Sequence, residues 1–256
     1  MKIKTFLLFF MVLVFTCAFT LPANAREIPP QDSSIDYSVG LEFSYNRANI
    51  LMGEDDLENS MTFNYLALEV DAALLDYLTV GVVAGYNTNY FNDPVDFYDL
   101  PLSLRINDER YKSMLLGLRV KSDFFSWKEF SLAAGGEYLY FKLFKEEMLI
   151  QLPIVTGAAT LKNSLYQVIL ELMVQYDGFT GLTIFAGPQW NLLKGKFTVS
   201  EDLEDLQDVQ TLTYKLKNAM GIAAGINFEA GSHFDINAKI SMFAKKSFSV
   251  EVFYIF

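Results

Sequence analysis

Apolar and polar residues alternate one by one along most of this chain. The clearest run lies at 35–46, where the odd positions are Ile35, Tyr37, Val39, Leu41, Phe43 and Tyr45 and the even positions are small or polar. Successive side chains of a β-strand point to opposite faces, so a period of two indicates a strand and excludes a helix. The pattern predicts an all-β fold with one apolar face.

Ten such segments recur along the sequence. They lie at about 35–46, 62–74, 78–86, 111–121, 129–142, 164–176, 181–192, 214–229, 234–243 and 248–256. The links between them are alternately long and short, which is typical of membrane barrels with short periplasmic turns and long outer loops. With both ends in the periplasm, every long link falls outside. The segments therefore predict a transmembrane antiparallel up-and-down β-barrel of about ten strands, with eight as the alternative.

The first residues have the features of an export signal. Lys2 and Lys4 precede an apolar run from Phe6 to Thr20, and Ala23-Asn24-Ala25 forms a small-residue cleavage site. This pattern predicts a signal peptide at 1–25, which is cleaved on export through the inner membrane. A short periplasmic segment would follow at 26–34, and the barrel would occupy 35–256.

Composition narrows the class of protein further. Hydrophobic residues make up 52% of the chain, yet no stretch after residue 25 is long and uncharged enough for a spanning helix. A closed barrel is the other structure that satisfies its backbone groups in lipid. After cleavage, 18 basic and 31 acidic residues leave a charge of −13 (18 − 31), because the signal holds two of the 20 basic residues. Such an acidic chain is not expected to bind nucleic acid.

The end of the chain carries the most specific resemblance. One face of the last segment is apolar and aromatic, and it consists of Phe248, Val250, Val252, Tyr254 and Phe256. This terminus resembles the small bacterial outer-membrane β-barrel proteins of the OmpA-like, opacity-like and PorT-like group, and the AGPQ stretch at 186–189 resembles a strand of the PorT-like barrels. The resemblance implies an outer-membrane address in a Gram-negative cell envelope. It also implies that this face, above all Tyr254 and Phe256, is the assembly signal read by the barrel-assembly machinery. A secreted β-sandwich is the alternative.

In each segment one set of alternate positions, which we call a parity, is apolar and the other is polar. The polar parity predicts which side chains lie in the barrel interior. If the apolar parity faces lipid, ten charged side chains point inward: Glu42, Glu69, Asp71, Arg119, Lys121, Glu137, Glu171, Asp235, Lys239 and Glu251. Ten strands enclose at most a narrow lumen. We expect Arg119 and Lys121 to organise an ion-pair network that plugs it. This predicts a non-catalytic protein with a structural or surface-interaction role. The alternative is a narrow porin whose acidic surplus favours cations.

Two other readings follow from the remaining polar residues. Outer-membrane hydrolases of similar size rely on a histidine, but the single histidine, His233 beside Ser232, falls in a predicted periplasmic turn. We therefore expect no enzyme and no cofactor. The outer links are acidic, with Glu54, Asp55, Asp56 and Glu58 in the first and Glu201, Asp202, Glu204, Asp205 and Asp208 in the last. Such oxygen-rich clusters could hold divalent cations that bridge to lipopolysaccharide, so outer-membrane lipid and lipopolysaccharide are the expected partners.

Overall fold

The computed structural model describes residues 36–75, 77–97, 104–106, 110–143, 146–151, 156–203 and 206–256. The predicted signal peptide at 1–25 and the predicted periplasmic segment at 26–34 lie outside these residues. The strands are β1 (Asp36–Met52), β2 (Leu57–Leu75), β3 (Leu78–Phe91), β4 (Val95–Phe97), β5 (Leu104–Ile106), β6 (Tyr111–Trp127), β7 (Phe130–Leu143), β8 (Glu146–Gln151), β9 (Thr156–Phe179), β10 (Leu182–Leu203), β11 (Leu206–Leu216), β12 (Met220–Glu229), β13 (Phe234–Met242) and β14 (Lys245–Ile255). No helix in the described part of the chain is long and apolar enough to cross a membrane.

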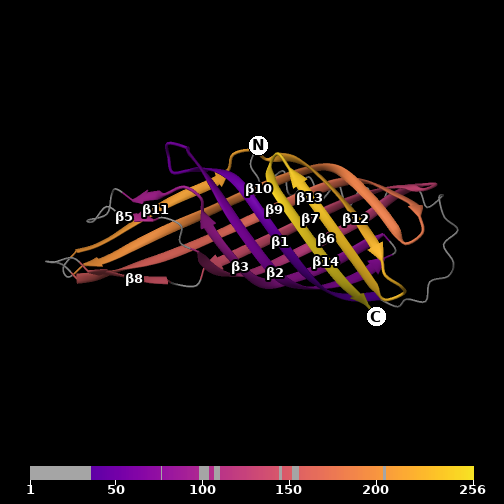
Figure 1. The fold of residues 1–256 in the computed structure, drawn as a ribbon, viewed down its shortest axis with the longest axis horizontal. Helices are drawn as coiled ribbons and strands as arrows, with labels where there is room; N and C mark the ends of the chain where they lie inside the picture. Colours follow the sequence, from indigo (N-terminus) through magenta and orange to yellow (C-terminus); the bar gives the residue numbers. More distant parts are fainter. Residues whose placement is uncertain are drawn as a thin grey trace.

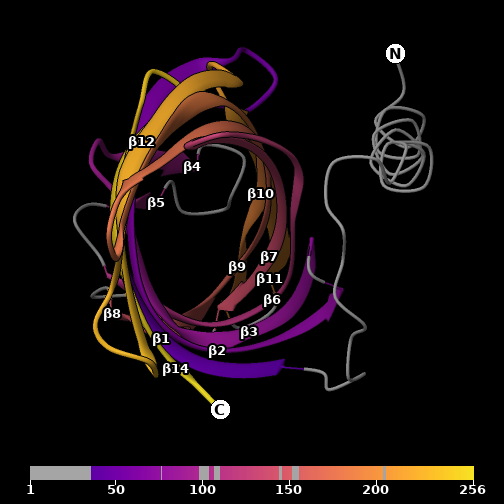
Figure 2. The ribbon, with the colours of Figure 1, turned by 90° about the vertical axis from the view of Figure 1, so that its right-hand side faces the viewer.

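Ten of these strands close into a ring, seen end-on in Figure 2. Its order is β1, β2, β3, β6, β7, β9, β10, β12, β13, β14 and back to β1, and every neighbouring pair is antiparallel. The first and last strands join the ring over a register that runs from Ser38–Ile255 to Ala48–Lys245. The predicted up-and-down barrel of ten strands is confirmed.

The apolar parity faces outward, as the alternation predicts. Leu41, Leu118 and Ile222 are each more than half exposed, while the residues that follow them, Glu42, Arg119 and Ala223, are buried on the inward side. The outward apolar positions recur on all ten strands of the ring. A water-soluble sandwich would bury this face against a second sheet, whereas lipid solvates it. The protein is an integral β-barrel of the outer membrane.

Several strands are longer than the sequence pattern indicated. β9 has 24 residues and β10 has 22, and Figure 1 shows β8, β9, β10 and β11 reaching far beyond the rest of the barrel at the left of the view. The expected loop at 193–213 is in fact a hairpin of β10 and β11, paired from Lys194–Lys215 to Leu203–Leu206. These hairpins continue the strands above the membrane, where backbone pairing satisfies the same hydrogen bonds that it satisfies in lipid.

The expected segment at 214–229 is divided between two strands. β11 ends at Leu216, β12 begins at Met220, and the β13–β14 hairpin ends below this break at Phe243 and Ala244. Above the hairpin β11 pairs directly with β1, through Ile50–Leu216 and Met52–Tyr214. The ring therefore narrows from ten strands at the membrane to eight at the outer end. The membrane-spanning ring has the ten strands of the main prediction, and the alternative of eight does not describe it.

Candidate functional site in the barrel lumen

Arg119 is the centre of a buried ion-pair cluster. It enters the lumen from β6, and its Nη2 contacts Glu69 and lies 2.9 Å from Asp71 Oδ2, both on β2. Its Nη1 lies 3.4 Å from Glu251 Oε2 on β14. The guanidinium carbon also lies 5.3 Å from the centre of the Phe253 ring. The planar, forked guanidinium suits several carboxylates at once, which a lysine could not match.

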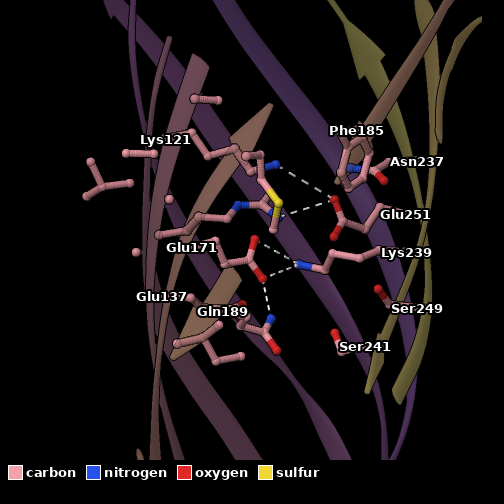
Figure 3. A pocket seen from close by; sticks show the side chains of 18 of the residues that line it. Lys121, Glu137, Glu171, Phe185, Gln189, Asn237, Lys239, Ser241, Ser249 and Glu251 are labelled. Atoms are coloured by element: carbon pink, nitrogen blue, oxygen red, sulfur yellow. Dashed lines mark hydrogen bonds and ion pairs between the residues drawn. The ribbon is translucent and has the colours of Figure 1, made fainter. Parts of the chain in front are cut away.

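A second cluster lies across the lumen from the first. Lys239 Nζ on β13 is 3.2 Å from Glu171 Oε1 on β9, and the Gln189 side-chain amide donates to the same oxygen from β10. Figure 3 shows this cluster and, above it, the contact between Lys121 and Glu251. Side chains from two other strands, β10 and β13, thus bind the Glu171 carboxylate of β9 and fix its position in the lumen.

Polar contacts near the β1–β14 seam complete the lower lumen. The Tyr65 hydroxyl donates to Glu42 Oε1 at 2.8 Å, and Lys245 Nζ donates to Asn46 Oδ1 at 2.8 Å. Between all these groups lies a cavity of about 200 Å³ that is lined from several strands by charged and polar side chains. A cavity with this volume and lining suits water.

The structure brings together most of the side chains that the sequence placed in the lumen. Glu69, Asp71, Arg119 and Glu251 form one cluster, Glu171 and Lys239 form another, and Glu42 binds Tyr65. Lys121 is peripheral, because its Nζ is 3.9 Å from Glu251 and its side chain is 45% exposed.

Glu137 and Asp235 stand apart from these contacts. Glu137 lies opposite Arg119 in the β6–β7 register and lines the lumen cavity, but it forms no ion pair with the described residues. Asp235 is the first inward residue of β13, near the periplasmic end. It likewise forms no ion pair with the described residues. Parity fixes the face on which a side chain lies, whereas ion pairing also depends on height within the lumen.

Several lumen residues were missing from the predicted network. The uncharged partners Asn46, Tyr65 and Gln189 were missed because only charged residues were considered. Lys245 was expected in the last turn, but it is buried and belongs to β14. It shares the odd parity of Ser247, Ser249 and Glu251, so the alternation itself could have placed it inside.

The outer half of the lumen is filled by apolar side chains. The strand residues Phe63, Leu115, Phe141, Leu165 and Phe197 are almost completely buried there, and they belong to one continuous cluster. Phe63 and Phe141 meet edge to face at 5.9 Å. Packing of this kind excludes water, in contrast to the polar cavity below it.

A short hairpin enters the ring and completes this apolar core. Val95 and Phe97 of β4 are fully buried, and Figure 2 shows β4 and β5 inside the outline of the barrel. The Phe97 ring lies 5.5 Å from that of Phe197, which also packs on Phe91 and Tyr111. Phe197 is therefore the centre of an aromatic plug, which sequence reasoning missed.

The predicted assembly face is a continuous outward surface of β14. Phe248, Val252, Tyr254 and Phe256 are all exposed on it, and Val250 shares their parity. The Tyr254 ring contacts Phe234 at 5.2 Å and Phe256 at 5.0 Å. The backbone N–H of Phe256 donates to Tyr37 O, so the last residue is tied to the first strand.

His233 lies in the turn between β12 and β13, at the end of the barrel that carries the chain terminus. Its Nδ1 is 2.6 Å from Ser232 Oγ, and its ring stacks on Tyr254. Within the described residues it has no carboxylate partner. Such a pair lacks the third group that orients a catalytic histidine.

The acidic outer segments take different positions. Asp56 and Glu58 pair with Lys215 and Lys217, while Glu201 is buried on the inward parity of β10. Glu204 and Asp205 lie outside the described residues. Among the residues described, no group of three or more His, Cys, Asp or Glu is arranged to hold a metal ion. Binding of divalent cations by these segments stays a prediction.

Comparison with known proteins gives a likeness of fold. No family model matches the chain, and no curated protein matches it. The solved structures that it resembles are outer-membrane β-barrels. The translocator domain of the autotransporter NalP from Neisseria meningitidis aligns with a TM-score of 0.46 at 13% identity, over 96% of this chain and 97% of that one. The outer membrane protein OprG from Pseudomonas aeruginosa aligns with 0.44 at 11%, over 88% and 97%. The outer membrane protease OmpT from Escherichia coli aligns with 0.44 at 8%, over 90% and 99%.

Proposed function

We propose that the protein is a non-conducting, non-catalytic barrel that serves the structure of the outer membrane and presents long hairpins for surface interaction. The observation that carries this proposal is the continuous apolar core across the outer lumen, centred on Phe197 and including Phe97 of the inserted hairpin. An ion must lose its hydration to cross such a core, at a cost of many kcal/mol. The ion-pair clusters below add a second barrier.

A narrow cation-preferring porin is the second candidate. The polar cavity of about 200 Å³ favours it, because Glu42, Glu171 and Glu251 all line this space. The cavity lies beneath the apolar core, so it would serve as a pathway only if the core opened. A hydrolase has less support, since the Ser232–His233 pair lies at the periplasmic end, away from the outer leaflet.

The test is conductance of the refolded mature protein in planar bilayers. We expect no steady single-channel current from the wild-type protein. Phe197→Ala removes the central ring of the plug and is expected to produce brief openings, because a cavity replaces the contacts with Phe91 and Phe97. Ile240→Ala, which alters a lipid-facing side chain, is the matched control. Steady, cation-selective current from the wild type would reject the proposal in favour of the porin.

A further inference from the structure

Outward-facing basic residues gather at one level of the barrel. On five strands of the ring, the first outward side chain above the apolar band is basic: Arg47 above Tyr45, Lys112 above Met114, Lys142 above Tyr140, Lys194 above Leu192 and Lys246 above Phe248. Lys162, Lys196, Lys215 and Lys217 lie on the outward parity just beyond this level. Together these nine residues form what we call the basic belt. At the periplasmic end, Lys128 is the single outward basic residue within the described part of the chain.

Like charges face each other directly within the belt. Lys194 is paired with Lys215 in the β10–β11 register, and Arg47 is paired with Lys246 in the β1–β14 register. Side chains directly opposite in an antiparallel pair have Cβ atoms about 5 Å apart, where like charges destabilise the sheet. Both pairs occur where a strand leaves the apolar band. An anion held between the two side chains would turn this repulsion into attraction.

The surface is hollowed at one of these pairs. A depression of about 420 Å³ is lined by Lys194, Lys196 and Lys215, with Ser164 and Tyr166 of β9 beside them. Lys196 lies opposite Ser164, and Lys194 lies opposite Tyr166. The hollow therefore combines three ammonium groups with hydroxyl donors, which is the donor set that a phosphate group requires.

The charge in the hollow is only partly balanced by the protein. Lys215 pairs with Asp56, whose Oδ1 is 2.8 Å from its Nζ. Lys194 and Lys196 make no ion pair with any described residue. Two positive charges are thus available to a ligand. Directly below them Leu192 continues the lipid-facing parity of β10, so an anion bound here would sit at the end of acyl chains packed against the barrel.

We propose that Lys194, Lys196 and Lys215 bind a phosphate group of an anionic lipid in the outer leaflet, such as the phosphorylated glucosamine end of lipopolysaccharide. The remaining residues of the basic belt lie outside the hollow and are not part of this site. The asymmetry between the two ends of the barrel supports this ligand, since basic residues are concentrated at the outer level. The site lies on the outer wall, so it is independent of whether the lumen conducts.

The experiment is a binding titration of the refolded full-length protein with lipid A that carries both phosphates. The test variant is Lys194→Gln/Lys196→Gln/Lys215→Gln, and each lost charge is expected to weaken binding about fivefold, or roughly 100-fold for the three. The control variant, Lys112→Gln/Lys128→Gln/Lys246→Gln, loses the same charge outside the hollow. Binding to it is expected to weaken by much less. Gel mobility before and after boiling checks that both variants are folded.

Two further arms identify the ligand chemistry. Dephosphorylated lipid A is expected to bind the wild type as weakly as the test variant does. Inorganic phosphate at the same concentration is expected not to compete, because it lacks the acyl chains. Equal weakening in both triple variants, equal binding of dephosphorylated lipid, or full competition by inorganic phosphate would each overturn the proposal.

Discussion

Arg119 on β6 is joined to Glu251 on the terminal strand β14 by an ion pair of 3.4 Å, although 132 residues separate them in the chain. β14, β1, β2, β3 and β6 follow one another around the ring, so this contact crosses the lumen rather than a strand interface. The same guanidinium also binds Glu69 and Asp71 of β2. One side chain therefore connects the beginning, the middle and the end of the barrel.

Removing this side chain should destabilise the barrel strongly. Arg119→Ala leaves the buried carboxylates of Glu69 and Asp71 without a cation and Glu251 with only Lys121. Breaking a buried ion pair costs about 3–5 kcal/mol. Arg119→Lys retains the charge but loses the forked geometry, so we expect a smaller loss. Urea unfolding in lipid vesicles, followed by gel mobility, measures both. A stability of Arg119→Ala equal to that of the wild type would show that the cluster is not a stabilising element.

Gly81 provides a milder test of the same cluster. Gly81 is on β3 and lies directly opposite Asp71 of β2. A Cβ placed at Gly81 would collide with the Asp71 carboxylate. Gly81→Ala should push Asp71 away from Arg119 and lower the free energy of unfolding by about 1–3 kcal/mol. The matched control is Gly135→Ala, whose Cβ would meet Glu171 at an ordinary 3.8 Å. If both substitutions have the same effect, the position of Asp71 does not matter.

The membrane-spanning part of the fold could be read from the sequence. Along β10 the outward positions Ile184, Ala186 and Leu192 are apolar, and the inward positions include Phe185 and Gln189. In lipid the solvent for the outer face is apolar, so the period and the parity together determine which residues enter the lumen. This is why the charged positions were found, including those from distant strands.

The outer half could not be read by the same rule. Odd positions of β10 point inward along the whole strand, but above Leu192 the apolar residues change from the outward to the inward face. Leu193, Phe197 and Val199 are apolar and inward, while Lys194 and Lys196 are outward. Here water surrounds the barrel, so the apolar face turns inward as in a soluble protein. The reversal is visible in the sequence, but it looks like a loop if a lipid-facing pattern is expected. The inward path of β4 is a tertiary property that no local pattern encodes.

The assembly role of the last strand predicts a specific defect. Deleting Phe256 should remove the terminal aromatic that contacts Tyr254 and should sharply reduce the amount of folded protein in the outer membrane. Phe243→Ala is the control. Phe243 is 72% exposed, as Phe256 is, but it lies in the turn before β14, at the other end of that strand. Heat-modifiable protein in the outer-membrane fraction is the measurement. Equal accumulation of both variants would contradict a terminal signal.

Tyr214 offers a test of the outer plug through pH. Its hydroxyl donates to Asn163 Oδ1 at 2.7 Å in the part of β11 that lies above the membrane, and burial raises the pKa of this phenol above its ordinary value of 10.0. The neutral phenol is thus favoured in the folded state. Its contribution to stability is complete below pH 10 and declines as the pH rises further, because the unfolded phenol ionises first.

Tyr214→Phe should therefore change the alkaline limit of stability. Below pH 10 the variant is expected to be less stable by about 1 kcal/mol, since Asn163 loses its donor. Above that pH the wild type should lose stability faster than the variant, and the two curves should converge. Urea unfolding between pH 8 and pH 11 gives the difference directly, and subtracting the variant removes the effect of the other tyrosines, which both proteins share. A constant difference across this range would mean that Tyr214 is not buried in the plug.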